Sequence, residues 1–191
     1  GTISHQLDHY FAKDYNLVID GVEIDRQILD VAEDYFDLNN ESLNVYNMDG
    51  RNFLAINDKK YDSIIIDVYS NQMYISFHLT TQEFFMQVND KLKNNGVVAI
   101  NVNATSDDSR ILKNITNTMN LVFDNVYQLH IKESGWNYMV IASQKELNFQ
   151  QLLAANKINE LDPLIKRILD NYKKIDYNNT FGYLTDDNAP I

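Results

Sequence analysis

Strand-like and helix-like segments alternate along this chain of 191 residues, and this alternation limits its fold more than any other feature. Amphipathic stretches with the 3.6-residue period of a helix are separated by short apolar runs of strand length. With their caps, the predicted helices of the first two-thirds cover residues 3–12, 25–36, 80–95 and 107–119. The predicted strands cover residues 16–24, 43–46, 61–68, 97–102, 125–132 and 136–143. This order predicts a doubly wound, mostly parallel α/β sheet.

The last two strands are separated by Glu133, Ser134 and Gly135, which predicts a hairpin and therefore an antiparallel edge at the C-terminal side of the sheet. Further on the pattern is helical, over residues 149–155 and 161–172, and then loop-like. We therefore expect one domain, with a core over residues 1–145 and a short helical C-terminal extension over residues 146–191.

Local signals mark where several of these helices begin and end. Asp25 is expected to cap the second helix, Thr80 or Thr81 the one after residue 80, and Asp107 or Asp108 the next. Asn95 and Gly96 are expected to stop the helix before the fourth strand in a left-handed C-cap. The 61–68 strand, with three successive isoleucines, is expected to be buried on both faces.

Composition excludes several classes of function. The formal net charge of −11 and the pI of about 4.6 argue against a nucleic-acid partner, because such a surface repels phosphate, and they suit cationic amines. The absence of cysteine excludes disulfides, thiolate metal sites and a cysteine nucleophile. No apolar run approaches the roughly 20 residues of a membrane-spanning helix.

Three successive predicted strands carry an acid at or just beyond their carboxyl ends: Glu23, Asp49 and Asp67. The carboxyl ends of parallel strands meet at one edge of a sheet, where ligands of such folds bind. For a nucleoside ligand, the first acid could accept hydrogen bonds from the ribose hydroxyls and the second from the adenine amino group, while the third would reach the reacting end. Each acid alone could equally cap a helix, and together they favour a site.

Four segments carry a resemblance to a known family: GVEIDRQILDVAEDYF, DGRNFL, KYDSIIIDVYS and FHLTTQEFFMQVNDKLKNNGVVAINV. In order and spacing they resemble the Rossmann-like, class I methyltransferase-fold core of spermidine synthases. FHLTT and the terminal LTDDNAP are similar to a divergent branch that is often fused to membrane segments. The resemblance covers residues 1–143 and the last few residues.

This resemblance implies a transferase that uses S-adenosylmethionine or its decarboxylated form, with aminopropyl or methyl transfer to a small amine and without a metal. Asp67 falls at the position of the general base that deprotonates the attacking amine. The other implied site residues are Gly1 and Thr2 at the end of a glycine-rich turn, Glu23 on the ribose, Ile24, Asp49 and Gly50 at the adenine, and Tyr69 in the substrate pocket. We add His78, in the loop near Asp67, as a candidate substrate residue, although a structural loop role competes with that function.

The chain also departs from the family pattern. The family's first strand and most of its glycine-rich turn would precede Gly1, so two strands are expected to lack a shared neighbour and this fragment is expected to be inactive. Thr2 and Ser70 stand where polyamine-making members commonly carry acids, which argues against putrescine as the acceptor. The missing second acid and the missing glycine-rich turn raise the alternative of a non-catalytic binding or assembly domain on the same scaffold. Methyl transfer to a small molecule is a third hypothesis.

The resemblance also bears on location and partners, and two pairs of residues are weaker candidates for metal sites. The membrane-fused branch implies an upstream membrane segment, with the domain in the cytoplasm or tethered to the cytosolic face, and a homodimer stays open. His5 and His9 share a helical face and could bind a metal, but a solvated face is the simpler interpretation. A turn or an inter-domain contact is favoured over a metal site for Asp186 and Asp187.

Overall fold

The computed structural model describes residues 2–36, 38, 43–67, 69–70, 74–131 and 135–188. The chain forms two compact units. The first unit comprises Gly1–Asn57 with Asn156–Asn159, and the second unit comprises Asp58–Ala155 with Glu160–Ile191. The predicted division at residue 145 stays a prediction.

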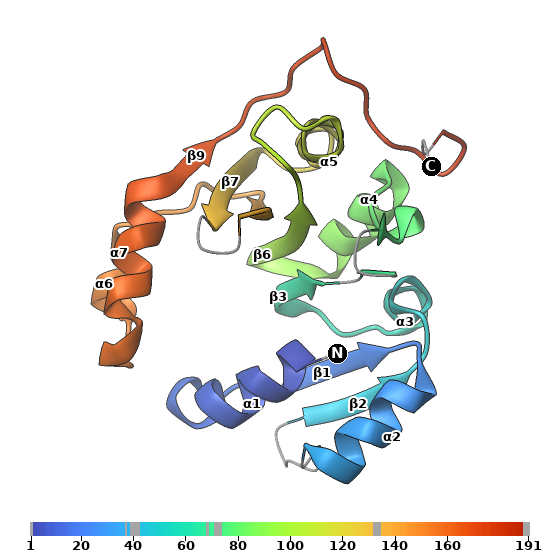
Figure 1. Cartoon of the computed structure of the whole chain (residues 1–191), viewed down its shortest axis with the longest axis vertical. Coiled ribbons are helices and arrows are strands. Elements are labelled where there is room, and N and C mark those ends of the chain that lie inside the picture. Colours follow the sequence, from blue (N-terminus) through green and yellow to red (C-terminus); the bar gives the residue numbers. More distant parts are fainter. Residues whose placement is uncertain are drawn as a thin grey trace. The chain divides into compact units, whose positions relative to one another are not determined.

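The first unit contains a parallel pair of strands with three helices (Figure 1). Its elements are α1 (Thr2–Tyr15), β1 (Ile19–Glu23), α2 (Arg26–Tyr35), β2 (Leu43–Asn47) and α3 (Gly50–Ile56). The β1–β2 ladder runs in register from Ile19 opposite Leu43 to Glu23 opposite Asn47. Leu29, Leu38 and Leu43 form a small buried core under this ladder.

Gly21 in the middle of β1 allows α1 to pack closely. A Cβ at this position would lie 2.8 Å from Ser4 Oγ and 3.2 Å from Leu43 Cδ1, distances that leave no room for a side chain. The glycine therefore serves close packing here.

The second unit is built on a five-stranded sheet with the order β3-β6-β8-β7-β9. Its strands are β3 (Tyr61–Ile66), β6 (Leu92–Asn103), β7 (Asn125–Ile131), β8 (Asn137–Ser143) and β9 (Tyr172–Lys174). Only the β3–β6 pair is parallel, and the pairs β6–β8, β7–β8 and β7–β9 are antiparallel. The predicted hairpin of residues 125–132 and 136–143 is thus confirmed, although residues 132–134 of its turn lie outside the described residues.

Helices and a small hairpin complete the second unit. The hairpin is formed by β4 (Tyr69–Ser70) and β5 (Tyr74–Ile75), and the helices are η1 (Phe77–Leu79), α4 (Gln82–Lys91), α5 (Arg110–Asn120), α6 (Gln151–Ala155) and α7 (Asp162–Asn171). The short helix η3 (Asn159–Leu161) begins with the last residue of the first unit and continues into the second. The mixed α/β architecture agrees with the prediction. In the described part of the chain, the parallel ladders β1–β2 and β3–β6 belong to separate sheets, and a strand upstream of Gly1 stays a prediction.

The predicted left-handed cap at Asn95 and Gly96 is wrong. Helix α4 ends at Lys91, and Leu92 is already extended, with φ −81° and ψ 147°. Leu92 pairs with Tyr61, and the register then shifts before Ser63 pairs with Val97. A Cβ on Gly96 would lie 3.0 Å from the carbonyl oxygen of Tyr61, so this glycine permits a close approach of two backbones.

Other sequence-based expectations also need correction. Helix α5 begins at Arg110, after Ser109, instead of at Asp107 or Asp108, and the carboxylate of Asp107 accepts a hydrogen bond from Lys173 Nζ at 2.6 Å. The predicted helix over residues 161–172 ends one residue too late, because Tyr172 is the first residue of strand β9, a strand that the sequence did not predict. Ile65 is 41% exposed, and within β3 only Ile66 is buried, so β3 is not buried on both faces.

Among the residues that the structure describes, no helix combines the length and apolar character needed to cross a membrane.

Candidate functional site

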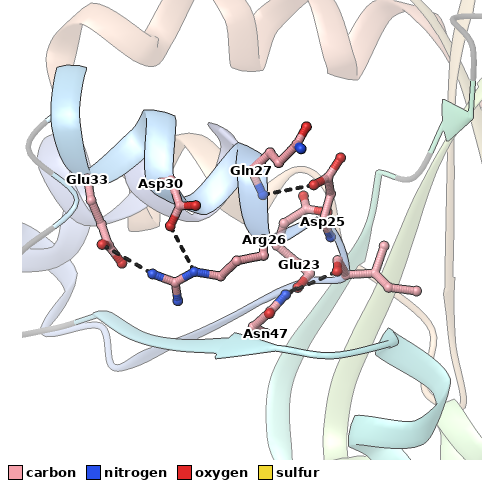
Figure 2. A network of polar contacts seen from close by, with 8 residues as sticks. Glu23, Asp25, Arg26, Gln27, Asp30, Glu33 and Asn47 are labelled. Atoms are coloured by element: carbon pink, nitrogen blue, oxygen red, sulfur yellow. Dashed lines mark hydrogen bonds and ion pairs between the residues drawn. The ribbon is translucent and has the colours of Figure 1, made fainter.

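The carboxyl ends of β1 and β2 are tied together by one side chain. Asn47 Nδ2 donates hydrogen bonds to the carbonyl oxygens of Glu23, at 2.9 Å, and of Ile24, at 3.0 Å (Figure 2). The backbone N–H of Met48 also donates to the Glu23 carbonyl, at 3.1 Å. These bonds hold the backbone beyond β1, and with it the Glu23 side chain, against the end of β2.

The Glu23 carboxylate is half-buried, and its Oε1 accepts a hydrogen bond from the backbone N–H of Asp25 at 3.0 Å. This bond aims the carboxylate at the turn between β1 and α2. Ile24 beside it is 67% exposed, so an apolar surface adjoins a carboxylate at this strand end. A carboxylate next to an exposed aliphatic side chain can bind a ribose diol and a flat base, and these two roles stay predictions.

Asp25 has the capping role that was expected of it. Its side chain accepts from Gln27 N at 2.8 Å and so satisfies one of the free N–H groups at the start of α2. Arg26 pairs with Asp30 at 2.8 Å and with Glu33 at 3.5 Å, on the exposed surface of α2 (Figure 2). The Asp25 cap explains why α2 begins where it does, and the ion pairs add contacts along its exposed surface.

Asp49 caps α3 in the same manner, since its carboxylate accepts from Asn52 N at 3.0 Å. Gly50 follows as the first residue of the helix, and a Cβ added to it would meet nothing within 4 Å. Packing among the described residues therefore gives no reason for a glycine at this position. The contact of this backbone with an adenine stays a prediction.

Asp67 follows β3 directly, one residue beyond the pairing of Ile66 with Ile100. Its carboxylate is exposed, and Oδ1 accepts a hydrogen bond from Asn101 Nδ2 at 3.1 Å. Asn101 lies on β6, at the corresponding point of the neighbouring parallel strand. The sequence analysis missed Asn101, and comparing the polar residues at the ends of adjacent parallel strands would have found it.

The chain returns toward Asp67 after a short hairpin. Tyr69 of β4 pairs with Ile75 of β5, and the η1 turn with His78 begins two residues later. Because paired strands lie about 5 Å apart, this hairpin brings the His78 turn back to the neighbourhood of the β3 end. The side chain of Tyr69 is outside the described part of the structure, and the predicted substrate role of His78 stays a prediction.

The predicted site residues thus form two groups. Glu23, Ile24, Asp49 and Gly50 lie at the strand ends of the first unit, whereas Asp67, Tyr69 and His78 belong to the second unit. That both groups line one cleft stays a prediction. Gly1 lies outside the described residues; Thr2 is the first residue of α1, and its side chain is not described.

The two histidines of α1 stack on each other, with ring centroids 6.0 Å apart. Within the described ranges, His, Cys, Asp and Glu side chains nowhere gather in groups of three or more that could hold a metal ion.

Comparison with known proteins gives a consistent result. The spermine/spermidine synthase domain matches residues 13–151. The chain is 32% identical to the probable polyamine aminopropyl transferase of Bifidobacterium longum, over all of this chain and 46% of that protein. It is 28% identical to the polyamine aminopropyltransferase of Vibrio vulnificus, over 90% of this chain and 60% of that protein. The chain therefore spans about half the length of these relatives.

The fold is also similar to a solved structure. The probable spermidine synthase from Corynebacterium glutamicum superposes with a TM-score of 0.73 and 19% identity, over 98% of this chain and 71% of that one. At this identity the likeness concerns the fold alone, and it extends over nearly all of the chain.

Proposed function

Because the chain belongs to the spermine/spermidine synthase family, we propose that it forms the core of an aminopropyltransferase that acts on decarboxylated S-adenosylmethionine and a small amine. Asp67 carries this proposal, because its carboxylate is exposed beyond a parallel strand and is held by a side chain of the adjacent strand. Aminopropyl transfer is preferred over methyl transfer because both relatives are named aminopropyl transferases.

The residues of the first unit fit the nucleoside part of such a co-substrate. Glu23 offers a half-buried carboxylate that the Asp25 N–H already orients. Beside it, the open space at Gly50 leaves room for a base against the start of α3. In the proposed complex, Glu23 accepts hydrogen bonds from the ribose hydroxyls, and Ile24 packs on the adenine.

The bound co-substrate supplies a sulfonium centre whose neighbouring carbon is open to attack. An amine attacks only when its nitrogen has a free electron pair, so the ammonium must first lose a proton. In the proposed reaction Asp67 accepts this proton from the attacking nitrogen. The new C–N bond forms as the C–S bond breaks, and neutral methylthioadenosine leaves with the electron pair of that bond.

The Asn101 hydrogen bond orients the Asp67 carboxylate for this step. Since Oδ1 accepts from Asn101, the carboxylate is held in one rotation at the strand end. The net charge of −11 further favours a cationic acceptor by long-range attraction. Ser70 stands in place of a second acid, so the acceptor is held here with one carboxylate fewer than in typical polyamine-making members.

The direct test uses the full-length protein that contains this chain. Calorimetry should detect binding of methylthioadenosine to the protein. Mass spectrometry should detect an aminopropylated product after incubation with decarboxylated S-adenosylmethionine and putrescine or a longer diamine. A methylated product with S-adenosylmethionine would contradict aminopropyl transfer. Nucleoside binding without any product would favour the non-catalytic alternative that Ser70 suggests.

A matched pair of variants tests the nucleoside site. Glu23→Gln is expected to weaken methylthioadenosine binding about tenfold or more, because hydrogen bonds to a charged acceptor contribute about 1.5–3 kcal/mol. Glu33→Gln, on the exposed face of α2, should leave binding unchanged. Equal affinities of the two variants would remove Glu23 from the site.

A further inference from the structure

The C-terminal segment of the chain is fastened along α5 by buried side chains. We call residues 178–188 the C-terminal strap; in Figure 1 it passes α5 and reaches α4. Asn117 is 2% exposed, and its Nδ2 donates to the carbonyl oxygen of Asn178 at 2.8 Å. The backbone N–H of Asn178 donates back to Asn117 Oδ1 at 3.0 Å. One buried amide of α5 thus holds the start of the strap.

The strap then crosses from α5 to the first turn of α4. The backbone N–H of Leu184 donates to Thr118 Oγ1 at 2.9 Å, and the Leu184 carbonyl accepts from Gln82 N at 2.8 Å. Thr118 and Leu184 are buried, at 0% and 3% exposure. Leu184 therefore connects the two helices through its own backbone, and it satisfies one of the free N–H groups at the start of α4.

Asp186 completes this junction. Its Oδ1 accepts a hydrogen bond from Thr81 Oγ1 at 2.7 Å, and its backbone N–H donates to Glu83 Oε2 at 3.0 Å. Thr81 is fully buried and is also the N-cap of α4, because its Oγ1 accepts from Phe84 N at 3.3 Å. The Asp186 carboxylate also lies at the positive end of the helix dipole.

The start of α4 is joined to the His78 turn by equally short contacts. Thr80 is 2% exposed, and both its Oγ1 and its N–H donate to the Phe77 carbonyl, at 2.7 and 2.9 Å. These two bonds fasten the first residue of the turn Phe77–Leu79 to the residue before the N-cap of α4. The hairpin of Tyr69 with Ile75 connects the other end of this turn to Asp67.

We propose that the C-terminal strap positions the His78 turn beside the end of β3, and that Asp186 is the positioning residue that locks it through Thr81. On the proposed function, which this inference extends, the turn lines the acceptor-amine side of the site. Residues 184–188 near the C-terminus then act on acceptor binding, although they are distant from Asp67 along the chain.

The chain offers a matched test, because Asp186 and Asp187 are adjacent, exposed and chemically identical. In the full-length protein, Asp186→Ala should raise amide hydrogen exchange in residues 77–84 about tenfold, whereas Asp187→Ala should not. The Michaelis constant for the diamine should rise roughly tenfold, since small misplacements are costly. The dissociation constant for methylthioadenosine should stay within about twofold of the wild-type value. Asp186→Asn should keep exchange and kinetics close to wild type, because its amide oxygen can still accept the hydrogen bond from Thr81.

Two results would overturn the inference. Identical exchange and kinetics in Asp186→Ala and Asp187→Ala would show that the carboxylate does not lock the turn. A parallel loss of methylthioadenosine affinity would show general unfolding instead of positioning. If the wild-type protein transfers no aminopropyl group, the proposed function fails, and the exchange measurement by itself still decides whether the strap holds the turn.

Discussion

The acids after β1 and β2 differ from the acid after β3 in what holds them. Glu23 and Asp49 accept hydrogen bonds from backbone N–H groups two and three residues further along the chain. Asp67 accepts from the side chain of Asn101, 34 residues away. The carboxylates of the first region are therefore oriented by local backbone groups, whereas the orientation of Asp67 depends on the pairing of β3 with β6. Hydrogen bonds from nearby backbone groups fix a carboxylate in a rigid turn. A hydrogen bond from a side chain can be removed by a substitution that leaves the backbone in place.

Substituting Asp67 should produce the largest effect on activity. Asp67→Asn removes the proton acceptor and is expected to lower kcat about 10²- to 10⁴-fold while methylthioadenosine affinity is unchanged. Steady-state kinetics of the full-length protein, together with calorimetry, check this. Asp62→Asn is the control, because Asp62 lies at the other end of β3 in an exposed ion pair with Lys93. Full activity of Asp67→Asn would end the catalytic assignment.

Removing the partner of Asp67 should have the next largest effect. Asn101→Ala leaves the carboxylate in place but frees its rotation, so kcat is expected to fall roughly tenfold to a hundredfold. Asn94→Ala, at the exposed start of β6, should behave as wild type. In the Asp67→Asn background, Asn101→Ala should cost nothing further, because the two residues act together. Additive losses would mean that Asn101 acts elsewhere.

Two glycines test the first region, around β1 and the start of α3. Gly21→Ala forces a Cβ to within 2.8 Å of Ser4 Oγ and should lower the free energy of unfolding by about 1–3 kcal/mol. Gly50→Ala meets nothing within 4 Å, so the fold should be as stable as wild type or slightly more stable. Thermal denaturation and methylthioadenosine binding separate the two, because only Gly50→Ala should weaken binding in a fully stable protein. Unchanged binding in Gly50→Ala would place the nucleoside away from α3.

The smallest effect is expected at Asp107, which like Asp67 is held by distant side chains. The hydrogen bond from Lys173 lowers the pKa of the Asp107 carboxyl, with Tyr138 contributing in the same direction against the opposing effect of burial. Burial, and after it the hydrogen bond with Asp107, raises the pKa of Tyr138 to about 12. Asp107 therefore belongs to a contact that ties β9 to the loop after β6.

A carboxylate with a lowered pKa stabilises the fold above its unfolded pKa of about 4, and this contribution is lost as the pH falls through the lower folded value. Because the pair is partly exposed, Asp107→Asn should cost less than about 1 kcal/mol at neutral pH. Denaturant unfolding at several pH values should show the difference from wild type shrinking below about pH 4. A difference that grows toward acid pH would contradict this account.

Local features of the fold were predictable from the sequence because their contacts span a few residues. The cap at Asp25 joins residues two apart, and the cap at Thr81 joins residues three apart. The helical stripes and the β7–β8 hairpin follow from short-range periodicity in the same way. The acids at the strand ends could be named as candidates because position in a strand is a local property.

The tertiary structure alone decided which distant residues meet. The extension of β6 to Leu92 depends on Tyr61, and β9 exists because residues 172–174 pair with β7. The bond between Thr81 and Asp186 joins residues 105 apart. No periodicity encodes such partners, because their proximity results from the packing of the whole second unit. The position of Asp67 at the end of a strand could be predicted from the sequence alone. Its hydrogen bond with Asn101 could not, because only the pairing of β3 with β6 brings the two residues together.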